Sequence, residues 1–398
     1  MIPRKQLDAS GRDLGRGLLA CVGLASRAPA RDRAGRPLLC ARADALVCLS
    51  VRSGFDLFLG EMNWTTGDEV LVTAITIPDM SRILREHGLV PVPVDLDPAT
   101  LAPDPAALAR AITPRTRAVL VAHLFGARLP LDPLLVWAHV RGLLVLEDCA
   151  QAFAADGFDG HAASDVRMFS FGTIKTATAF GGGILLVRDT PLLARLSARH
   201  ARWPAQTNGL YARRLLKFGA FTLVQAPWSY GALFRAIRLC GGNPDDVITA
   251  LGRGFAGGDF FAKIRHRPSR ALQAMLAWRL ATYDAARVQA RAATGEFVLA
   301  RVPAVRPLGA CADRRTHWLF PLRVRNADAL LPILWRAGFD ATRASSSLHA
   351  LPAAGDRAAP QAARAMRDVL YVPVYAAMGE ARLAQLAALL NLHAQPAE

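Results

Sequence analysis

Short apolar runs alternate with helical patterns through the first half of the chain. The apolar runs lie at residues 70–76, 90–94, 119–123 and 143–146, and helical patterns lie between them at residues 105–111 and 130–140. A continuous apolar run of this length suits a strand buried on both faces. Strands that alternate with helices predict βαβ units and a mostly parallel sheet.

The flanking regions predict further elements around this sheet. A short helix is expected near residues 14–24, and an apolar run at residues 46–49 leads into a helix that opens at Ser53-Gly54. Residues 268–300 read as helical, followed by a strand at 316–324 and helices at 330–337 and 381–390. We therefore expect an N-terminal segment (1–44), a large domain (45–204), an insert (205–262), and a linking helix with a small α+β C-terminal domain (263–398).

The insert contains a stretch without any charged residue, residues 218–234, which arginines and Lys217 flank. It is shorter than the roughly 20 residues that a membrane-spanning helix needs, and Pro227 interrupts it. Two alternatives stay open. It is either a buried helical hairpin that packs between subunits, or a peripheral membrane contact through residues 213–238 with arginines at the headgroups.

Composition narrows the class of protein. The 398 residues are 52% hydrophobic and 20% charged, which favours a globular protein, and the net charge of +16 comes from scattered arginines. The chain contains no basic run with interleaved aromatic residues, so no nucleic-acid partner is expected. The six cysteines form no CxxC pair and no cluster with histidine, so neither a disulfide framework nor a metal site is expected. The polar start lacks the apolar core of a signal peptide, and a cytoplasmic location is expected.

Candidate chemistry gathers between residues 147 and 183. Asp148 ends a predicted buried strand, and the carboxyl end of such a strand is where open α/β sheets bind ligands; His123 ends another. Lys175 is one of only four lysines in a chain that otherwise uses arginine. Lysine, unlike arginine, can lose its proton when partly desolvated and attack a carbonyl group.

The ordered set of motifs around Lys175 resembles the DegT/StrS-type sugar aminotransferases, a family of fold-type-I pyridoxal-phosphate (PLP) enzymes. The set consists of Asp148-Cys149-Ala150-Gln151, then Phe169-Ser170-Phe171, then Lys175 and a run of three glycines. Further matching segments extend the resemblance over roughly residues 46–200. The resemblance implies an α/β fold of type I, with a mostly parallel seven-stranded sheet between helices and a smaller α+β domain.

The resemblance also implies roles for individual residues. Lys175 would bind PLP covalently and act as general acid–base. Asp148 would pair with the pyridinium nitrogen, Gln151 would contact the ring hydroxyl, and Ser170 would bind the phosphate. Since position 175 is lysine rather than the histidine of the family's dehydratase branch, transamination is favoured.

Other family positions differ in this chain. Ser53, Gly54 and Phe55 match the phosphate turn, where backbone donors would bind the phosphate, but Phe55 and Asp56 replace threonine and alanine. The aliphatic Ile77 stands where the family stacks an aromatic ring on the cofactor, and His123 would line the site. For the substrate, the resemblance points to Arg267, in an arm that reaches the partner subunit's site, and to His349.

The function that follows from the resemblance is a homodimeric PLP-dependent aminotransferase. It would move an amino group from glutamate or glutamine to a keto or aldehyde acceptor, such as a nucleotide-linked keto-sugar or a related glycan- or lipid-linked intermediate. The alternative is a degenerate family member that acts as a regulatory or scaffold protein with weak or no PLP chemistry.

Overall fold

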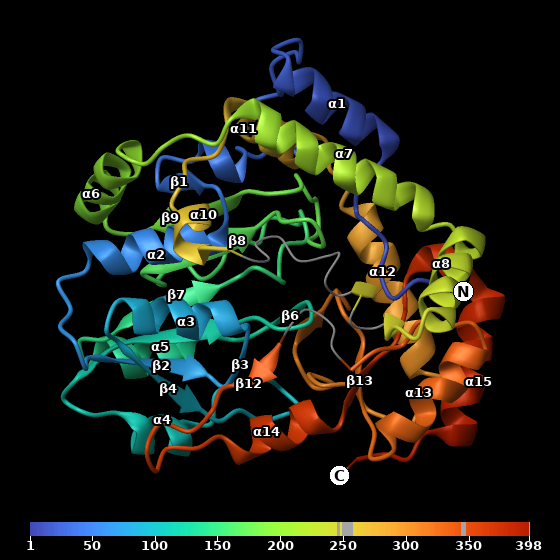
Figure 1. The fold of residues 1–398 in the computed structure, drawn as a ribbon. Helices are drawn as coiled ribbons and strands as arrows, with labels where there is room; N and C mark the ends of the chain where they lie inside the picture. Colours follow the sequence, from blue (N-terminus) through green and yellow to red (C-terminus); the bar gives the residue numbers. More distant parts are fainter. Residues whose placement is uncertain (245–246, 249–257, 344–347, 398) are drawn as a thin grey trace.

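A seven-stranded sheet forms the centre of the molecule in the computed structural model, which describes residues 1–244, 247–248, 258–343 and 348–397 (Figure 1). Its strand order is β1-β9-β8-β7-β5-β2-β4. In this sheet β9 runs opposite to the other six strands. The strands are β1 (Ala45–Cys48), β2 (Glu69–Thr73), β4 (Val90–Val94), β5 (Thr116–Ala122), β7 (Leu144–Asp148), β8 (Val166–Ser170) and β9 (Gly183–Val187). The predicted fold class is confirmed.

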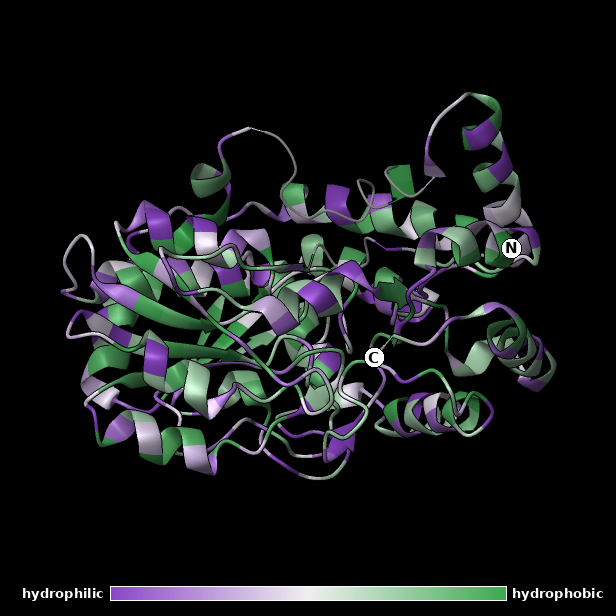
Figure 2. Cartoon of the chain, turned by 90° about the horizontal axis from the view of Figure 1, so that it is seen from below, coloured by the Kyte–Doolittle hydropathy of each residue, from purple (hydrophilic) through white to green (hydrophobic). Residues whose placement is uncertain are grey.

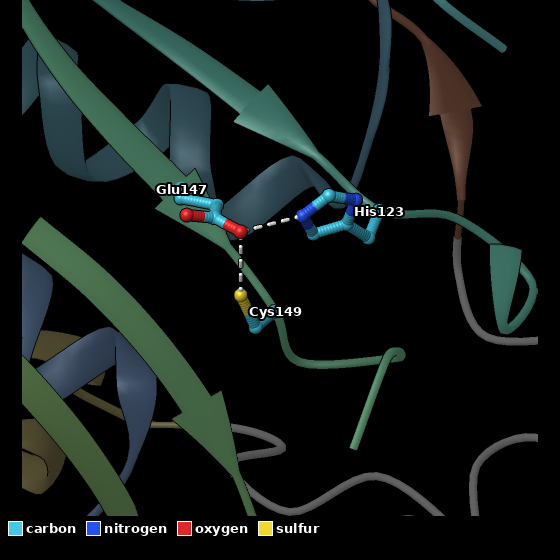
Figure 3. A group of neighbouring side chains, drawn as sticks. All are labelled: His123, Glu147 and Cys149. Atoms are coloured by element: carbon cyan, nitrogen blue, oxygen red, sulfur yellow. Dashed lines mark hydrogen bonds and ion pairs between the residues drawn. The ribbon is translucent and has the colours of Figure 1, made fainter. Parts of the chain in front are cut away.

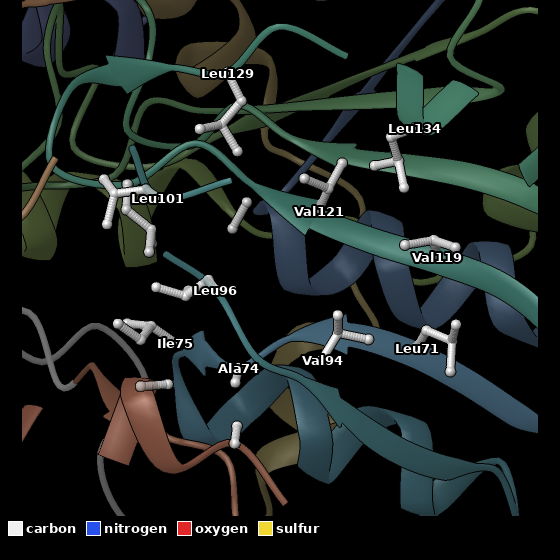
Figure 4. Packing of buried hydrophobic residues seen from close by; sticks show 14 of the residues in the cluster. Leu71, Ala74, Ile75, Val94, Leu96, Leu101, Val119, Val121, Leu129 and Leu134 are labelled. Atoms are coloured by element: carbon white, nitrogen blue, oxygen red, sulfur yellow. The ribbon is translucent and has the colours of Figure 1, made fainter. Parts of the chain in front are cut away.

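Both faces of the sheet are apolar and covered. Leu71 and Val119 point to one face, where α4 (Pro105–Ala111) and α5 (Asp132–His139) pack (Figure 4). Val70 and Leu120 point to the other face, towards α2 (Val51–Glu61), α3 (Pro78–Glu86) and α6 (Thr190–Ala201). Because neighbouring residues of a strand point to opposite faces, burial of both faces explains the uninterrupted apolar runs in the sequence. Figure 2 shows these apolar strands inside the polar surfaces of the helices.

A second, smaller core lies at the C-terminal end of the chain. Here α12 (Ala286–Leu299), α13 (Ala327–Arg336) and α15 (Glu380–His393) pack with β11 (Pro321–Arg323) and β13 (Val369–Tyr371). The strand expected at 316–324 is limited to β11, because its partner β13 is equally short. The stretch expected to be helical at 268–300 is two helices, α11 (Arg270–Thr282) and α12, with residues 283–285 between them.

The remaining short elements connect these layers. They are α1 (Gly11–Cys21), η1 (Leu39–Ala41), β3 (Ile75–Thr76), β6 (Ala127–Arg128), α10 (Phe260–Ile264), β10 (Arg314–Arg315), β12 (His349–Ala350), α14 (Pro360–Arg367) and η3 (Ala376–Met378). Three antiparallel pairs, β6 with β10, β3 with β12, and β11 with β13, lie outside the main sheet.

The described part of the predicted insert contains the helices α7 (Asn208–Val224) and α8 (Pro227–Leu239) and the first residues of α10. Tyr211, Leu215 and Phe218 of α7 are buried with side chains of α11. Within the residues that the structure describes, no helix has the length and apolar character needed to cross a membrane. The inner face of the insert therefore packs within the chain, which gives no support to the membrane alternative. Residues 245–246 and 249–257 of this predicted unit lie outside the described residues.

Candidate functional site

Asp148 and Lys175 lie at the carboxyl ends of two neighbouring parallel strands. Asp148 is the last residue of β7, and Lys175 is in the loop that follows β8. Burial raises the pKa of Asp148, although the positive charge of Lys175 opposes this. Burial lowers the pKa of Lys175 to about 8; Asp148 opposes this shift and Arg52 adds to it. The two groups thus feel each other's charge, yet no ion pair joins them in the described structure.

Three polar groups at this edge have capacity for a ligand. Oδ1 of Asp148 accepts a hydrogen bond from the Ala150 amide (2.9 Å). In the described part of the chain, no donor reaches its Oδ2, and neither the Ser170 hydroxyl nor the Lys175 ammonium has a hydrogen-bond partner. Lys175 instead lies over the Trp318 ring, with Nζ 4.2 Å from the ring centroid. Carboxylate, hydroxyl and amine groups with unused hydrogen-bonding capacity at one sheet edge are typical of a binding site.

Gln151 stabilises the neighbouring turn. Its Oε1 accepts a hydrogen bond from the Phe125 amide at 2.8 Å. Phe125 has a φ of 59°, an uncommon conformation for a residue with a bulky side chain. This contact uses the amide oxygen of Gln151 and leaves its N–H groups to donate to a ligand.

Two arginines bring positive charge to the loop between Ser170 and Lys175. Arg214 of α7 donates from Nη2 to Oγ1 of Thr173 (3.3 Å), while its buried Nε has no partner in the described structure. Burial lowers the pKa of Arg214; the Tyr211 phenol opposes this and the charge of Arg52 adds to it. No sequence motif indicated Arg214, because this residue lies in the predicted insert and reaches the loop only through tertiary packing. An anion here would be attracted by both charges.

The start of α2 corrects the predicted phosphate turn. The helix begins at Val51, because the Ser50 hydroxyl caps it and accepts from the Ser53 amide (3.1 Å). The Gly54 amide donates to the Ser50 carbonyl oxygen (3.1 Å). Ser53 and Gly54 therefore already have acceptors for their backbone N–H groups, and Phe55 is fully buried in the core. These three residues are part of the helix and its packing, not backbone donors at its open end.

Glycine allows this helix start to approach the sheet closely. A Cβ atom at Gly183 of β9 would lie 2.4 Å from the Val51 nitrogen. The last residue of the glycine run is thus needed for packing between β9 and α2, which places Arg52 near Lys175 and Asp148.

Asp56 points away from the site. Its carboxylate accepts from Nε and Nη2 of Arg265 (2.9 Å each) and lies 3.0 Å from Nε2 of His87. Burial acts to raise the pKa of Asp56, but the hydrogen bonds from His87 and Arg265 outweigh it and lower this pKa. The negative charge at this position therefore does not weaken an anion site at the start of α2.

We expect Asp56→Ala to lower the free energy of unfolding by about 1–3 kcal/mol, because it leaves Arg265 and His87 without their buried acceptor. Denaturant unfolding measures this change. Folding lowers the pKa of Asp56. The difference in the free energy of unfolding between wild type and variant should therefore be largest above about pH 5 and shrink as the pH falls below about 4. Asp328→Ala is the matched control, because Asp328 pairs with Arg343 but is 83% exposed. An equal effect of both changes would contradict the assignment.

His123 belongs to a buried cluster on the opposite side of β7 from Asp148. Its Nε2 lies 2.7 Å from Oε1 of Glu147, and Cys149 donates to the same oxygen (Figure 3). The Leu129 amide donates to Nδ1 (3.0 Å), so the proton of the neutral ring is on Nε2 and is donated to Glu147. The prediction that His123 lines the cofactor site is therefore corrected: both nitrogens are used within the core.

The same cluster also has the residue types of a metal site. The ligand atoms of His123, Glu147 and Cys149 lie within 4.8 Å of one another. However, a metal on Nε2 would require Nδ1 to carry the proton, and Nδ1 accepts from Leu129. The cluster therefore fits a hydrogen-bonded core network better than a metal centre.

The other predicted site residues lie at two places. Ile77 is half-buried at the N-cap of α3, directly after β3, and His349 of β12 pairs with Thr76 of that strand. Arg267 lies elsewhere, with Nε donating to the Trp203 carbonyl oxygen (2.9 Å), and it makes no contact with the Lys175 loop in the described chain. Its role in the site of a partner subunit stays a prediction.

The N-terminal segment contacts the Lys175 loop, which the sequence did not reveal. Asp8 accepts from the Ala177 amide (2.9 Å) and the Tyr283 hydroxyl (2.6 Å). Nζ of Lys5 lies 4.2 Å from the centroid of the Trp318 ring, the same ring that Lys175 contacts. Residues more than 100 positions apart in the sequence therefore surround one loop.

Comparison with known proteins identifies the segment that carries this site. The model of the DegT/DnrJ/EryC1/StrS aminotransferase family matches residues 39–203. An L-glutamine:2-deoxy-scyllo-inosose aminotransferase of Micromonospora echinospora is 39% identical over 143 residues, 35% of this chain and 34% of that protein. The GDP-perosamine synthase of Caulobacter vibrioides is 35% identical over 159 residues, 39% of this chain and 43% of that protein. The chain thus matches less than half the length of these relatives.

The fold is similar over a longer range. The crystal structure of the sugar aminotransferase CalS13 from Micromonospora echinospora superposes with a TM-score of 0.64 at 22% identity, covering 98% of this chain and all of that one. The sheet, the Asp148 strand end and the Lys175 loop all lie within residues 39–203, the segment that matches the model of the DegT/DnrJ/EryC1/StrS aminotransferase family.

Proposed function

We propose that the protein is a PLP-dependent aminotransferase with Lys175 as the residue that binds the cofactor. The observation that carries this proposal is the pair formed by Lys175 and Asp148. An amine with a pKa of about 8 and a carboxylate with an unused oxygen lie at one sheet edge without neutralising each other. The family of residues 39–203 supports the same chemistry.

The residues present fit the chemical groups of PLP. The amine of Lys175 suits its aldehyde, the unused Oδ2 of Asp148 suits its pyridine nitrogen, and the N–H groups of Gln151 suit its ring oxygen. The hydroxyl of Ser170, with the charges of Arg52 and Arg214, suits its phosphate. Ile77 would pack against the ring without the stacking geometry of an aromatic side chain.

When bound, PLP supplies an aldehyde that bonds to amines and a ring that accepts electron density. The residues of the chain would position the cofactor and transfer protons. Asp148, kept as a carboxylate, would hold a positive charge on the ring nitrogen. Lys175, once released by an amino substrate, would take up a proton at Nζ and return it, as its lowered pKa allows near neutral pH.

We infer that the acceptor is a keto-sugar or keto-cyclitol and that the donor is glutamine or glutamate. The names of the relatives support this class: they include L-glutamine:inosose aminotransferases and a GDP-perosamine synthase. A homodimer is also proposed, since the arm that contains Arg267 makes no contact with the Lys175 loop among the residues that the structure describes.

The test of the proposed function is amino transfer by the purified protein incubated with PLP. We expect keto product from glutamine or glutamate in the presence of a keto-sugar or keto-cyclitol acceptor. Absence of a PLP absorbance band at saturating cofactor would reject the proposal and favour a scaffold role.

The rate at which the protein captures PLP should depend on pH. Only the neutral amine attacks, so the rate should rise about tenfold per pH unit up to about pH 8 and then level off. In Asp148→Asn the midpoint should move to lower pH, because the carboxylate raises the pKa of Lys175. Stopped-flow absorbance measures both profiles. A midpoint near pH 10 in the wild type would show that Lys175 is not perturbed.

A further inference from the structure

A cavity of about 300 Å³ adjoins Lys175. Its walls come from residues 4–8, the 174–176 loop, residues 283–291 around the start of α12, residues 318–320 and residues 372–377. Asp148, Gln151 and Ser170 are not among the lining residues. Lys175 is thus shared between the cofactor residues and this cavity. In Figure 1 the chain runs from the N label past α12 to α1. Residues 4–8 of this segment line the cavity.

The lining is strongly basic. Five basic residues and one acidic residue contribute to it: Arg4, Lys5, Lys175, Arg287, Arg291 and Asp8. Asp340 binds Arg4 through two hydrogen bonds (2.7 and 2.9 Å), and Asp8 pairs with Arg287 (2.6 Å). In the described structure no carboxylate pairs with Lys175 or with Arg291. The cavity therefore has positive charge that the protein itself does not neutralise.

Arg291 is held in place with one donor group unused. Its Nε donates to the Thr316 carbonyl oxygen (2.8 Å) and its Nη1 to Oγ1 of Thr176 (3.2 Å). Its Nη2 is buried and has no partner in the described structure. A buried charged donor without an acceptor is costly. The planar guanidinium suits a carboxylate, and Arg291 is already fixed for that contact.

Lys5 and Lys175 both contact the Trp318 ring at this cavity. Both ammonium groups lie 4.2 Å from the centroid of the Trp318 ring, and the Trp318 indole N–H donates to the Ile174 carbonyl oxygen (3.2 Å). Burial and the charge of Lys175 lower the pKa of Lys5. An anion in the cavity would reduce the repulsion between these two amines.

We propose that this cavity is the subsite for a carboxylate of the amino donor and that Arg291 is the residue that binds it. The inference rests on the proposed function, because Lys175 connects the subsite with the cofactor residues. A volume of about 300 Å³ is at the lower end for ligand pockets and suits an amino acid rather than a nucleotide-linked sugar. The phosphate of an acceptor has similar chemistry, and the experiment distinguishes the two sources.

The test is calorimetric binding of three probes to the protein incubated with PLP: glutarate, inorganic phosphate and the neutral glutaramide. We expect glutarate to bind more tightly than phosphate, and glutaramide not to bind. Arg291→Gln should weaken glutarate binding at least about tenfold, as loss of a charge-assisted pair predicts. Arg301→Gln, a change of an exposed arginine just beyond α12, is the matched control and should bind as the wild type does.

Three outcomes would overturn the proposal: equal glutarate binding by Arg291→Gln and wild type, tighter binding of phosphate than of glutarate, or no glutarate binding. If Arg291→Gln does not fold, Arg291→Lys decides, because it keeps the charge and loses the planar fork; unchanged glutarate affinity would then contradict the proposal. The PLP band is recorded on the same samples. Glutarate binding without a band rejects the proposed function alone, whereas a band without glutarate binding rejects only the subsite.

Discussion

Lys175→Arg should abolish both covalent capture of PLP and amino transfer. Arginine keeps the positive charge next to Trp318 but cannot give up its proton in a protein, so no nucleophile remains at this position. The same residue is assigned the proton transfer, and loss of a positioned general acid–base typically costs about 10²–10⁴-fold in rate. With the covalent bond lost as well, the rate should fall to background. Borohydride treatment followed by intact-mass measurement reports the capture, and an assay of keto product reports the transfer.

Lys217→Arg is the matched control for this change. Lys217 is an exposed lysine on α7, with its ammonium 5.3 Å from the Phe218 ring centroid, and it lies outside the cavity at Lys175. It should keep both the covalent mass and the activity. Full activity in Lys175→Arg would refute the assignment.

Asp148→Asn should leave the fold and the covalent capture intact but slow amino transfer by about 10²–10³-fold. The asparagine side chain is nearly isosteric and can still accept from the Ala150 amide. It has no negative charge to hold a proton on the cofactor ring, and removal of one preorganised electrostatic contact from an active site costs a factor of this order. Steady-state kinetics with a saturating donor measures the change as a fall in kcat.

Glu147→Gln distinguishes this effect from a general loss of a buried carboxylate. Glu147 precedes Asp148 on β7 but points to the opposite side, where it accepts from the His161 amide (2.8 Å) and contacts His123 (2.7 Å). Replacement of Glu147 should lower the free energy of unfolding, with little change in kcat. The account fails if Asp148→Asn unfolds the protein while Glu147→Gln specifically lowers kcat.

Local patterns in the sequence predicted the large fold well. The apolar run at 90–94 coincides with β4 and the helical pattern at 105–111 with α4, because strands buried on both faces and helices capped by Asp104 leave local signals. Element ends were less predictable. The start of α2 lies before Ser53, because the Ser50 hydroxyl accepts a hydrogen bond from the Ser53 amide. The Ser53-Gly54 pair alone does not reveal whether Ser50 or Ser53 caps the helix.

The site was predictable only where a motif marks it. Asp148 and Lys175 stand out by spacing, and the structure places them at one edge of the sheet. Arg214, Trp318 and Arg291 carried no signal, because α7, the segment before β11 and α12 reach the Lys175 loop through long-range packing. His123 was misassigned for the opposite reason: a strand end indicates closeness to the site, but the direction of the ring depends on the buried Glu147.

The most direct test of the central claim is peptide mapping of the protein after incubation with PLP and reduction with borohydride. Two lysines, Lys5 and Lys175, share the Trp318 ring, and both have lowered pKa values. We predict that the added mass lies on the peptide containing Lys175 and that this lysine is protected from tryptic cleavage. Label on Lys5 alone, or no label at saturating PLP, would contradict the assignment of Lys175 as the residue that binds the cofactor.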